Sequence, residues 1–116
     1  MTIDPRTHLP LKPVDLEILL ALADEARHGY GLVQTISERT SGLLVLDPGN
    51  LYRVIKRLLG DALIVEADDH AHPDGDRRRY YTITPLGGRV LAAELRRLRA
   101  LVDAPDTRAL VRRWLS

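Results

Sequence analysis

The side chains of this chain best suited to bind another molecule are arginines and lysines, which gather in three blocks. The blocks are Arg53, Lys56 and Arg57; Arg77, Arg78 and Arg79; and Arg89, Arg96, Arg97 and Arg99. Guanidinium and ammonium groups bond phosphate oxygens and the edges of guanine bases. Because the formal net charge is only +1, we expect local anion-binding surfaces rather than a uniformly basic molecule.

The sequence offers no set of side chains for catalysis. It contains no cysteine, which excludes disulfides, thiolate nucleophiles and thiolate metal sites. His8 and His28 stand alone, no serine lies in a nucleophile-elbow setting, and no glycine-rich phosphate loop is present. We therefore expect a protein that is not an enzyme and needs no cofactor.

One polar segment carries the residue types of a metal site. These residues are Asp68, Asp69, His70, His72, Asp74 and Asp76, and imidazole and carboxylate groups bind divalent cations. Pro73-Asp74-Gly75 in the same segment is typical of a turn. We interpret the segment as a turn between two strands and expect no metal; a metal that orders this turn is the alternative.

The first part of the chain predicts two helices and a short strand. Pro13 suits the first turn of a helix whose inward residues are Leu16, Leu19, Leu20 and Ala23. A second helix is expected over about 30–40, ended by Ser41 and Gly42. The wholly apolar run 43–46 predicts a small buried strand.

The third expected helix has the clearest boundaries. Asp47 followed by Pro48 is an N-cap with proline at the first helical position, and the helix runs to about Leu59 and stops at Gly60. Its apolar stripe is Leu51, Val54, Ile55 and Leu58. Its opposite face carries Asn50, Arg53 and Arg57, flanked by Lys56. One side can anchor the helix, while the other offers partners for guanine, adenine and phosphate.

Beyond residue 60 the hydrophobic period changes. Residues 64–67 and 79–83 predict two strands of a hairpin, joined by the charged segment 68–78. Thr84-Pro85 repeats the cap-and-proline signal and opens a long helix to about Val102. After Ala104-Pro105 a short amphipathic helix is expected, with Leu110, Val111, Trp114 and Leu115 on one side.

This order of elements predicts a winged helix-turn-helix with a C-terminal dimerisation helix, in a mainly α fold with a small β-hairpin (α+β). We divide the chain into a flexible N-terminal arm (1–12), the winged helix-turn-helix DNA-binding domain (13–84), and the dimerisation helix with a short tail helix (85–116). Such a fold places an exposed helix in the major groove of double-stranded DNA and a hairpin beside it.

The sequence shows no signal that would direct the protein to or across a membrane. No apolar run approaches the roughly 20 residues that span a bilayer, and residues 1–13 do not resemble a secretory signal. We expect a soluble, cytoplasmic protein with no membrane partner.

At these positions the sequence resembles the PadR-type transcriptional regulators, over about residues 16–98. The resemblance rests on the first helix at 16–22, His28-Gly29-Tyr30-Gly31-Leu32, Pro48-Gly49-Asn50-Leu51-Tyr52-Arg53, Arg57-Leu58, Leu63-Ile64, and 77–84 followed by Gly87 or Gly88. Asn50 departs from the more usual threonine or serine, and Ala62 from the more usual glycine.

The resemblance implies a cytoplasmic, dimeric repressor of the short C-terminal class, which releases its operator in response to a ligand or stress. It implies DNA contacts from the third helix and the hairpin, that is, from Asn50, Tyr52, Arg53, Lys56, Arg57 and Arg77, Arg78, Arg79. Tyr30 is a candidate phosphate contact at the start of the second helix. Tyr30 and Tyr52 as core aromatics are the alternative.

The long helix predicts a partner copy. Leu91, Leu95, Leu98 and Val102 follow the 4-3-4 spacing of a coiled-coil seam, so we expect a homodimer that reads a palindrome. A small aromatic or hydrophobic effector is a candidate partner, and Trp114 is interpreted as docked on its own domain or on the partner. The competing interpretation of the whole chain is a winged-helix protein–protein interaction module without specific DNA binding.

Overall fold

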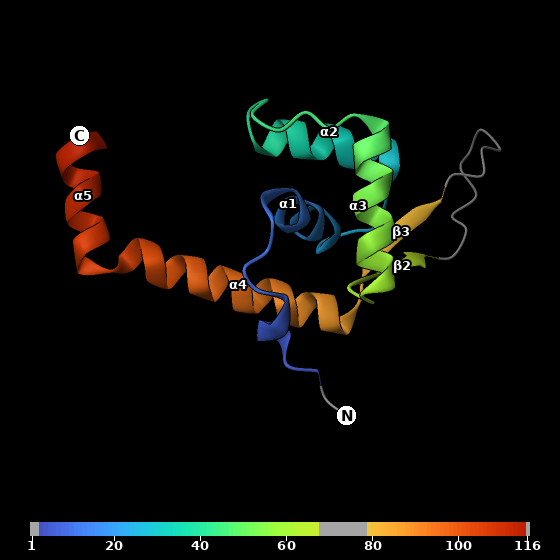
Figure 1. Ribbon diagram of the computed structural model, residues 1–116. Helices are drawn as coiled ribbons and strands as arrows, with labels where there is room; N and C mark the ends of the chain where they lie inside the picture. Colours follow the sequence, from blue (N-terminus) through green and yellow to red (C-terminus); the bar gives the residue numbers. More distant parts are fainter. Residues whose placement is uncertain (1–2, 68–78, 116) are drawn as a thin grey trace.

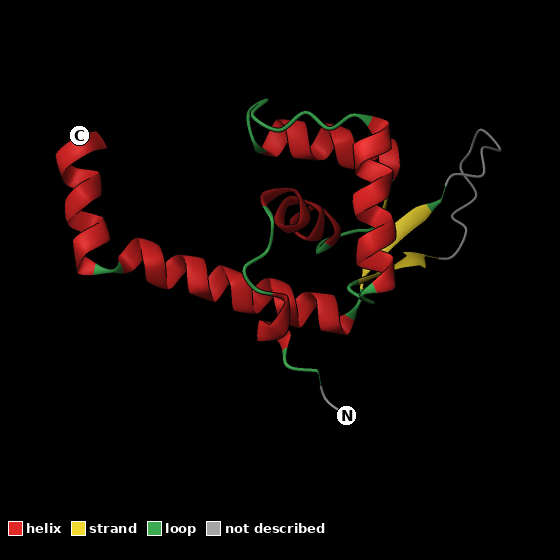
Figure 2. Ribbon diagram, in the orientation of Figure 1, coloured by secondary structure: helices red, strands yellow, loops and turns green. Residues whose placement is uncertain are grey.

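The computed structural model describes residues 3–67 and 79–115, and Figure 1 shows their arrangement. In chain order the elements are η1 (Pro5–His8), α1 (Pro13–Leu22), β1 (Arg27–His28), α2 (Gly29–Arg39), α3 (Pro48–Gly60), β2 (Ile64–Ala67), β3 (Tyr80–Ile83), α4 (Pro85–Asp103) and α5 (Pro105–Leu115). Helices dominate the described part, with one small sheet at the side (Figure 2). The expected fold class, mainly helical with a hairpin in winged helix-turn-helix order, is confirmed.

Helix α1 forms the centre of the core, in contact with α2, α3 and α4 (Figure 1). Its residues Ile18, Leu19 and Leu22 are fully buried. Of the residues predicted at helical spacing, Leu19 is buried and Leu16 and Leu20 are half-buried against the core. Ala23 is the exception, since it follows the last residue of α1 and is exposed. Because α1 is apolar almost all round and covered on several sides, a one-sided period does not describe it.

The predicted hairpin, which we call the wing, is confirmed to within one residue by strands β2 and β3. The sheet has a third strand that was not predicted. The strand order is β1-β3-β2, all antiparallel, with Ile64 opposite Ile83 and Ala67 opposite Tyr80. Strand β1 pairs Arg27 with Tyr81. It has only two residues, too few for an alternating pattern to reveal it.

The predicted buried strand at 43–46 is wrong. These residues form an irregular connection between α2 and α3. Leu43 is 84% exposed, Leu44 packs partly against the core and Leu46 is buried in it. Ser41 and Gly42 have positive φ values of 53° and 80°, which end α2 in a turn. A run of apolar residues predicts burial only where a strand or helix lies beside it.

Helix starts follow the sequence signals. The Asp47 carboxylate accepts from the backbone N–H of Asn50 at 2.9 Å, and the Thr84 hydroxyl accepts from the N–H of Gly87 at 2.9 Å. Proline occupies the first turn of both helices. These caps satisfy N–H groups that the helices themselves leave unpaired.

The start of α4 is held tightly against the end of the α3–β2 connection. The Thr84 hydroxyl donates to the carbonyl of Ala62 at 2.6 Å, and the Thr84 N–H donates to the carbonyl of Leu63 at 3.1 Å. A Cβ atom built on Gly87 would lie 2.0 Å from the Leu63 carbonyl oxygen. Glycine is therefore required at position 87 for α4 to approach this closely.

Helix α4 begins under the domain and then projects beyond it, and α5 turns away from its far end (Figure 1). Residues 3–12, expected as an arm, cross α4 (Figure 1), with η1 in contact with that helix. Among the described residues, no helix combines the length and apolarity needed to cross a membrane.

Candidate nucleic-acid interface

Helix α3 buries one face and exposes the other. Leu51, Val54, Ile55 and Leu58 pack in the core, as the apolar stripe predicts. Tyr52, Arg53 and Lys56 are exposed on the outside. Neither Arg53 nor Lys56 has an ion-pair partner in the part of the chain that the structure describes. Their charges are therefore available to a ligand.

Arg57 differs from these two cations. Its Nη2 atom lies 2.5 Å from Oδ1 of Asp15, a buried carboxylate in the first turn of α1. The prediction of a freely available Arg57 is thus corrected: its charge is already paired inside the subunit. Desolvated carboxylates need such a partner, and this pair joins the last turn of α3 to α1.

Asn50 lies in the first turn of α3 and is half-buried. Its backbone N–H is bound by the Asp47 cap. The residue therefore stands at the N-terminal end of α3, on the same turn as the exposed Tyr52 and Arg53. In helix-turn-helix proteins this end of the recognition helix reaches base edges.

The N-terminus of α2 is built by the His28-Gly29-Tyr30-Gly31 sequence. The His28 Nδ1 atom accepts from the Gly31 N–H at 3.1 Å and so caps the helix. The His28 ring stacks on Tyr30, with ring centroids 6.4 Å apart, and meets Tyr80 of the wing edge-on at 5.3 Å. One histidine thus links α2, the wing and an exposed tyrosine.

The two tyrosines lie on the surface, which excludes their interpretation as core aromatics. Tyr30 is 65% exposed and Tyr52 is 52% exposed. A Cβ on Gly29 would lie 2.7 Å from the Tyr52 hydroxyl oxygen, so glycine lets the α3 tyrosine reach the start of α2. Between the two helices lies a depression of about 210 Å³, lined by Gly29, Tyr30, Val33, Leu46, Pro48, Leu51 and Tyr52.

The described part of the wing carries one predicted contact residue. Arg79 is exposed and lies 3.7 Å from Glu66 on the neighbouring strand. Arg77, Arg78 and the His70–His72 segment lie outside the described residues. Over 3–67 and 79–115, no group of three or more histidine, aspartate or glutamate side chains is placed to hold a metal ion.

The predicted dimerisation residues divide into two groups. Leu91 packs in the core of its own subunit and is 6% exposed, so it is not available to a partner, which corrects that part of the prediction. Leu95 and Val102 are exposed and Leu98 is half-buried. Leu91 differs because it lies on the part of α4 that covers the domain, whereas the other three lie farther along the helix.

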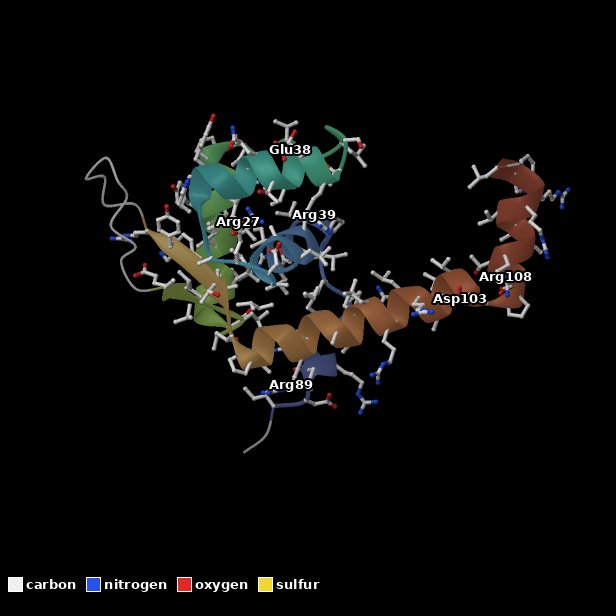
Figure 3. All side chains as sticks on the ribbon, turned by 180° about the vertical axis from the view of Figure 1, so that it is seen from behind. Arg27, Glu38, Arg39, Arg89, Asp103 and Arg108 are labelled. Atoms are coloured by element: carbon white, nitrogen blue, oxygen red, sulfur yellow. The ribbon has the colours of Figure 1, made fainter. Side chains whose placement is uncertain are left out.

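Helix α5 exposes its apolar side chains. They are Leu110, Val111, Trp114 and Leu115. Trp114 is 70% exposed, and the Arg113 guanidinium lies 5.3 Å from its ring centre. Trp114 is therefore not docked on its own domain, and its docking on a partner subunit stays a prediction. Asp103 and Arg108 stand on either side of the bend between α4 and α5 (Figure 3).

Sequence reasoning missed three residues that shape this surface. They are Asp15, His28 and Glu94. Asp15 pairs with Arg57, His28 caps α2, and Glu94 accepts a hydrogen bond from the backbone N–H of Leu11. Asp15 and Glu17 are two acids in a helix that is otherwise apolar, and this was the available signal for Asp15, because a buried charge needs a partner. The sequence around Glu94 carries no comparable signal.

Comparison with known proteins identifies the family. The transcriptional regulator PadR-like family matches residues 18–93. The transcriptional regulator Rv3488 of Mycobacterium tuberculosis is 39% identical over 88 residues, which cover 76% of this chain and 78% of that protein.

Two solved structures share the fold. A PadR family regulator from Clostridium difficile R20291 has a TM-score of 0.69 at 22% identity, over 90% of this chain and all of its own. Bacillus subtilis PadR in complex with operator DNA has a TM-score of 0.64 at 20% identity, over 74% of this chain and 48% of its own. The chain belongs to the PadR-like family of transcriptional regulators.

Proposed function

We propose that this protein is a DNA-binding transcriptional repressor that acts as a homodimer on a palindromic operator and is released by a ligand or stress signal. The observation that carries the proposal is the outward face of α3. Arg53 and Lys56 project from it with no ion-pair partner among the described residues, while the opposite face is fixed in the core. Two further findings support it: membership of the PadR-like family, and a fold shared with a regulator solved on operator DNA.

The proposed reading surface is the N-terminal half of α3. A guanidinium such as that of Arg53 can bond both acceptors of a guanine, and the Asn50 amide can pair with adenine. Tyr30, exposed at the start of α2, suits a phosphate oxygen, because the positive end of the helix dipole lies there. The arginines of the wing, Arg77 to Arg79, would extend the contact to the flanking backbone.

The proposed dimer is supported by apolar surface that the single chain leaves in water. Beyond the domain, α4 exposes Leu95, Leu101 and Val102, and α5 exposes four more apolar side chains. A monomer rarely leaves so continuous an apolar stretch uncovered. A second copy seated along α4 would cover it and place two α3 helices about 34–36 Å apart, one turn of DNA.

The test uses a duplex selected from a random pool by the wild-type protein. Arg53→Ala and Lys56→Ala should each weaken binding and lower the dependence on salt, because each removes a cation that displaces counterions or bonds a base; for a base-reading arginine the loss is about 1–3 kcal/mol. Arg39→Ala, a cation on α2 paired with Glu17, is the control and should bind as the wild type. Wild-type affinity in both α3 variants would refute this face as the reading surface.

We propose the groove between η1 and α4 for the effector, a small aromatic or hydrophobic molecule. This groove measures about 460 Å³ and is lined by Arg6, Leu9, Ala93, Arg96, Arg97 and Ala100. Its apolar floor and cationic rim suit such a compound. In keeping with a family of regulators, we propose no enzymatic role, no cofactor and a cytoplasmic location.

A second candidate function is a protein–protein interaction module without specific DNA binding. The observation that favours it is the exposed apolar pair Leu43 and Val45 in the connection between α2 and α3, since contiguous apolar surface marks binding sites. The selection experiment separates the two functions: enrichment of a two-fold DNA sequence supports the repressor, and no enrichment at low salt supports the module.

A further inference from the structure

Glu94 is a buried carboxylate that fastens the N-terminal segment to α4. It is 1% exposed. Its Oε2 atom accepts from the backbone N–H of Leu11 at 2.7 Å, and its Oε1 atom accepts from Nε of Arg97 at 2.5 Å. The Arg97 hydrogen bond, together with that from Leu11, lowers the pKa of Glu94 against the opposing effect of burial. The group is therefore ionised at neutral pH and bonds Leu11 as a charged acceptor, which makes the bond strong.

A second charged bond is made by the residue four positions after Leu11. Asp15, in the first turn of α1, pairs with Arg57 in the last turn of α3. Between the two anchors the chain holds Lys12, Pro13 and Val14, and Pro13 both starts α1 and fixes its own φ angle. We call residues 11–15 the strap.

The strap joins the two helices that matter for the proposed function. In Figure 1 the N-terminal segment crosses α4 and leads directly into α1, which lies between α4 and α3. One end of the strap is tied to the middle of α4 and the other to the last turn of α3. The contacts are made by single carboxylates, each buried and each with its arginine.

Helix α4 is also attached, at its beginning, to the connection that follows α3, where Thr84 bonds the carbonyls of Ala62 and Leu63. Val90 and Leu91 of α4 are buried in the core, and the helix contacts α1. Glu94 lies ten residues beyond Thr84, about 15 Å along the helix at 1.5 Å per residue. Its bond to Leu11 adds a charged attachment to this apolar packing, at the distance where it most restricts the angle between α4 and α3.

We propose that Glu94 and Asp15 are positioning residues, and that the strap they anchor sets the spacing of the two half-sites that the dimer recognises. The inference rests on the proposed function, since it needs the dimer along α4 and a palindromic DNA. In such a dimer α4 carries the two-fold axis and α3 reads the base pairs. The angle between α4 and α3 therefore decides how far apart the two α3 helices stand.

The dimensions of the proposed dimer show how strongly a small movement of α4 changes the spacing of the two α3 helices. Two recognition helices about 34 Å apart each lie about 17 Å from the axis, and one base pair is about 3.4 Å. A change of one base pair moves each helix by about 1.7 Å along the DNA and also turns the half-sites relative to each other by about a tenth of a turn. A displacement of about 1.7 Å at the strap, about 15 Å from Thr84, rotates α4 by about 6°, so a small movement there shifts the α3 helices by an amount comparable to one base-pair step.

The main variant is Glu94→Leu. Leucine is apolar, and the carboxylate it replaces lies beside buried Val90 and Leu91, so the fold should survive. The Leu11 anchor is nevertheless lost. The control is Asp103→Asn, which removes an acid of the same helix whose pair with Arg99 lies on the surface.

The experiment measures affinity for three duplexes: the palindrome that wild type selects from a random pool, and versions with one base pair added or removed between the half-sites. Wild type and Asp103→Asn should lose about tenfold or more on both altered duplexes, as for a mismatched site. Glu94→Leu should bind all three within about threefold, with an unchanged affinity for a single half-site. A folded, dimeric Glu94→Leu with the wild-type profile overturns the inference.

Asp15→Asn provides the second, independent measurement. Its affinities for the three duplexes should also differ less than those of wild type, which gives a flatter profile of affinity against half-site spacing. Because both changes release one strap, the double variant should be no flatter than either single variant, although distant residues normally act additively. Additive effects overturn the inference. An unchanged profile in Asp15→Asn overturns it as well, and does so even if Glu94→Leu fails to fold. A wild type that selects no two-fold sequence overturns the proposed function itself, and the inference with it, before any variant is compared.

Discussion

The end of α3 has a residue that its backbone conformation disfavours, and this gives a quantitative prediction. The N–H of Ala62 bonds the carbonyl of Leu59 and the N–H of Leu63 bonds that of Leu58, both at 3.0 Å. These two bonds form a Schellman motif with Ala62 at the C′ position. Its φ is +59°, in the left-handed region where glycine is the usual residue. We predict that Ala62→Gly stabilises the protein.

The magnitude follows from two opposing effects. A non-glycine residue in the left-handed region costs roughly 1–2 kcal/mol. Glycine also gives the unfolded chain more conformational freedom, which lowers the free energy of unfolding by about 0.4–1 kcal/mol. Ala62 is exposed, so its methyl group contributes little burial. The net gain should be about 0.5–1 kcal/mol, which for a domain of this size raises Tm by about 2–4 °C.

The assay is urea unfolding followed by circular dichroism, at one fixed protein concentration because a dimer's stability depends on it. The matched control is Ala23→Gly, at an exposed helix end where φ is −68°; there glycine should destabilise by about 0.4–1 kcal/mol. Ser41→Gly, with φ of 53° at the equivalent end of α2, should repeat the gain. An Ala62→Gly protein no more stable than Ala23→Gly would refute the backbone argument.

Three further predictions follow from the same contacts. Gly87→Ala should destabilise strongly, by about 3 kcal/mol or more, because its Cβ would meet the rigid Leu63 backbone at 2.0 Å; a near-neutral unfolding midpoint contradicts this. Gly29→Ala should cost far less stability, since the atom it meets is the end of the exposed Tyr52 side chain, and Tyr52→Phe should recover the loss. The folded-state pKa of Glu94 lies below its ordinary value of 4.5, so its contribution is fully present above that pH and is lost as the pH falls through the folded value. Stability curves of wild type and Glu94→Leu should therefore converge in acid, and a gap that is constant with pH would argue against an ionised Glu94.

The features that could be predicted from the sequence are those encoded over a few neighbouring residues. Asp47-Pro48 and Thr84-Pro85 each contain both the capping group and the proline, so the two helix starts are where the sequence places them. Strand β1 could not be found in this way. It is a strand only because Tyr80 and Tyr81, far along the chain, lie beside it.

The same distinction applies to the candidate site. The exposed face of α3 follows from the period of its apolar residues, and Arg53 and Lys56 lie where that period predicts. Arg57 has the same chemistry and a similar position on the helix, yet Asp15, 42 residues away in sequence, has bound it. Whether a surface cation is free is decided by tertiary contacts that a helical pattern does not contain.

These contacts also explain why the two ends of α3 have different roles. Its last turn is fixed by the Schellman motif at Ala62, by the Thr84 hydroxyl on the Ala62 carbonyl, and by the Asp15–Arg57 pair. Its first turn is capped by Asp47 but leaves Tyr52 and Arg53 on the surface. A helix inserted in a groove must hold its direction against the forces of binding while offering unpaired groups to the bases. Fixing one end with charge and backbone bonds therefore leaves the other end free for the base contacts that we propose.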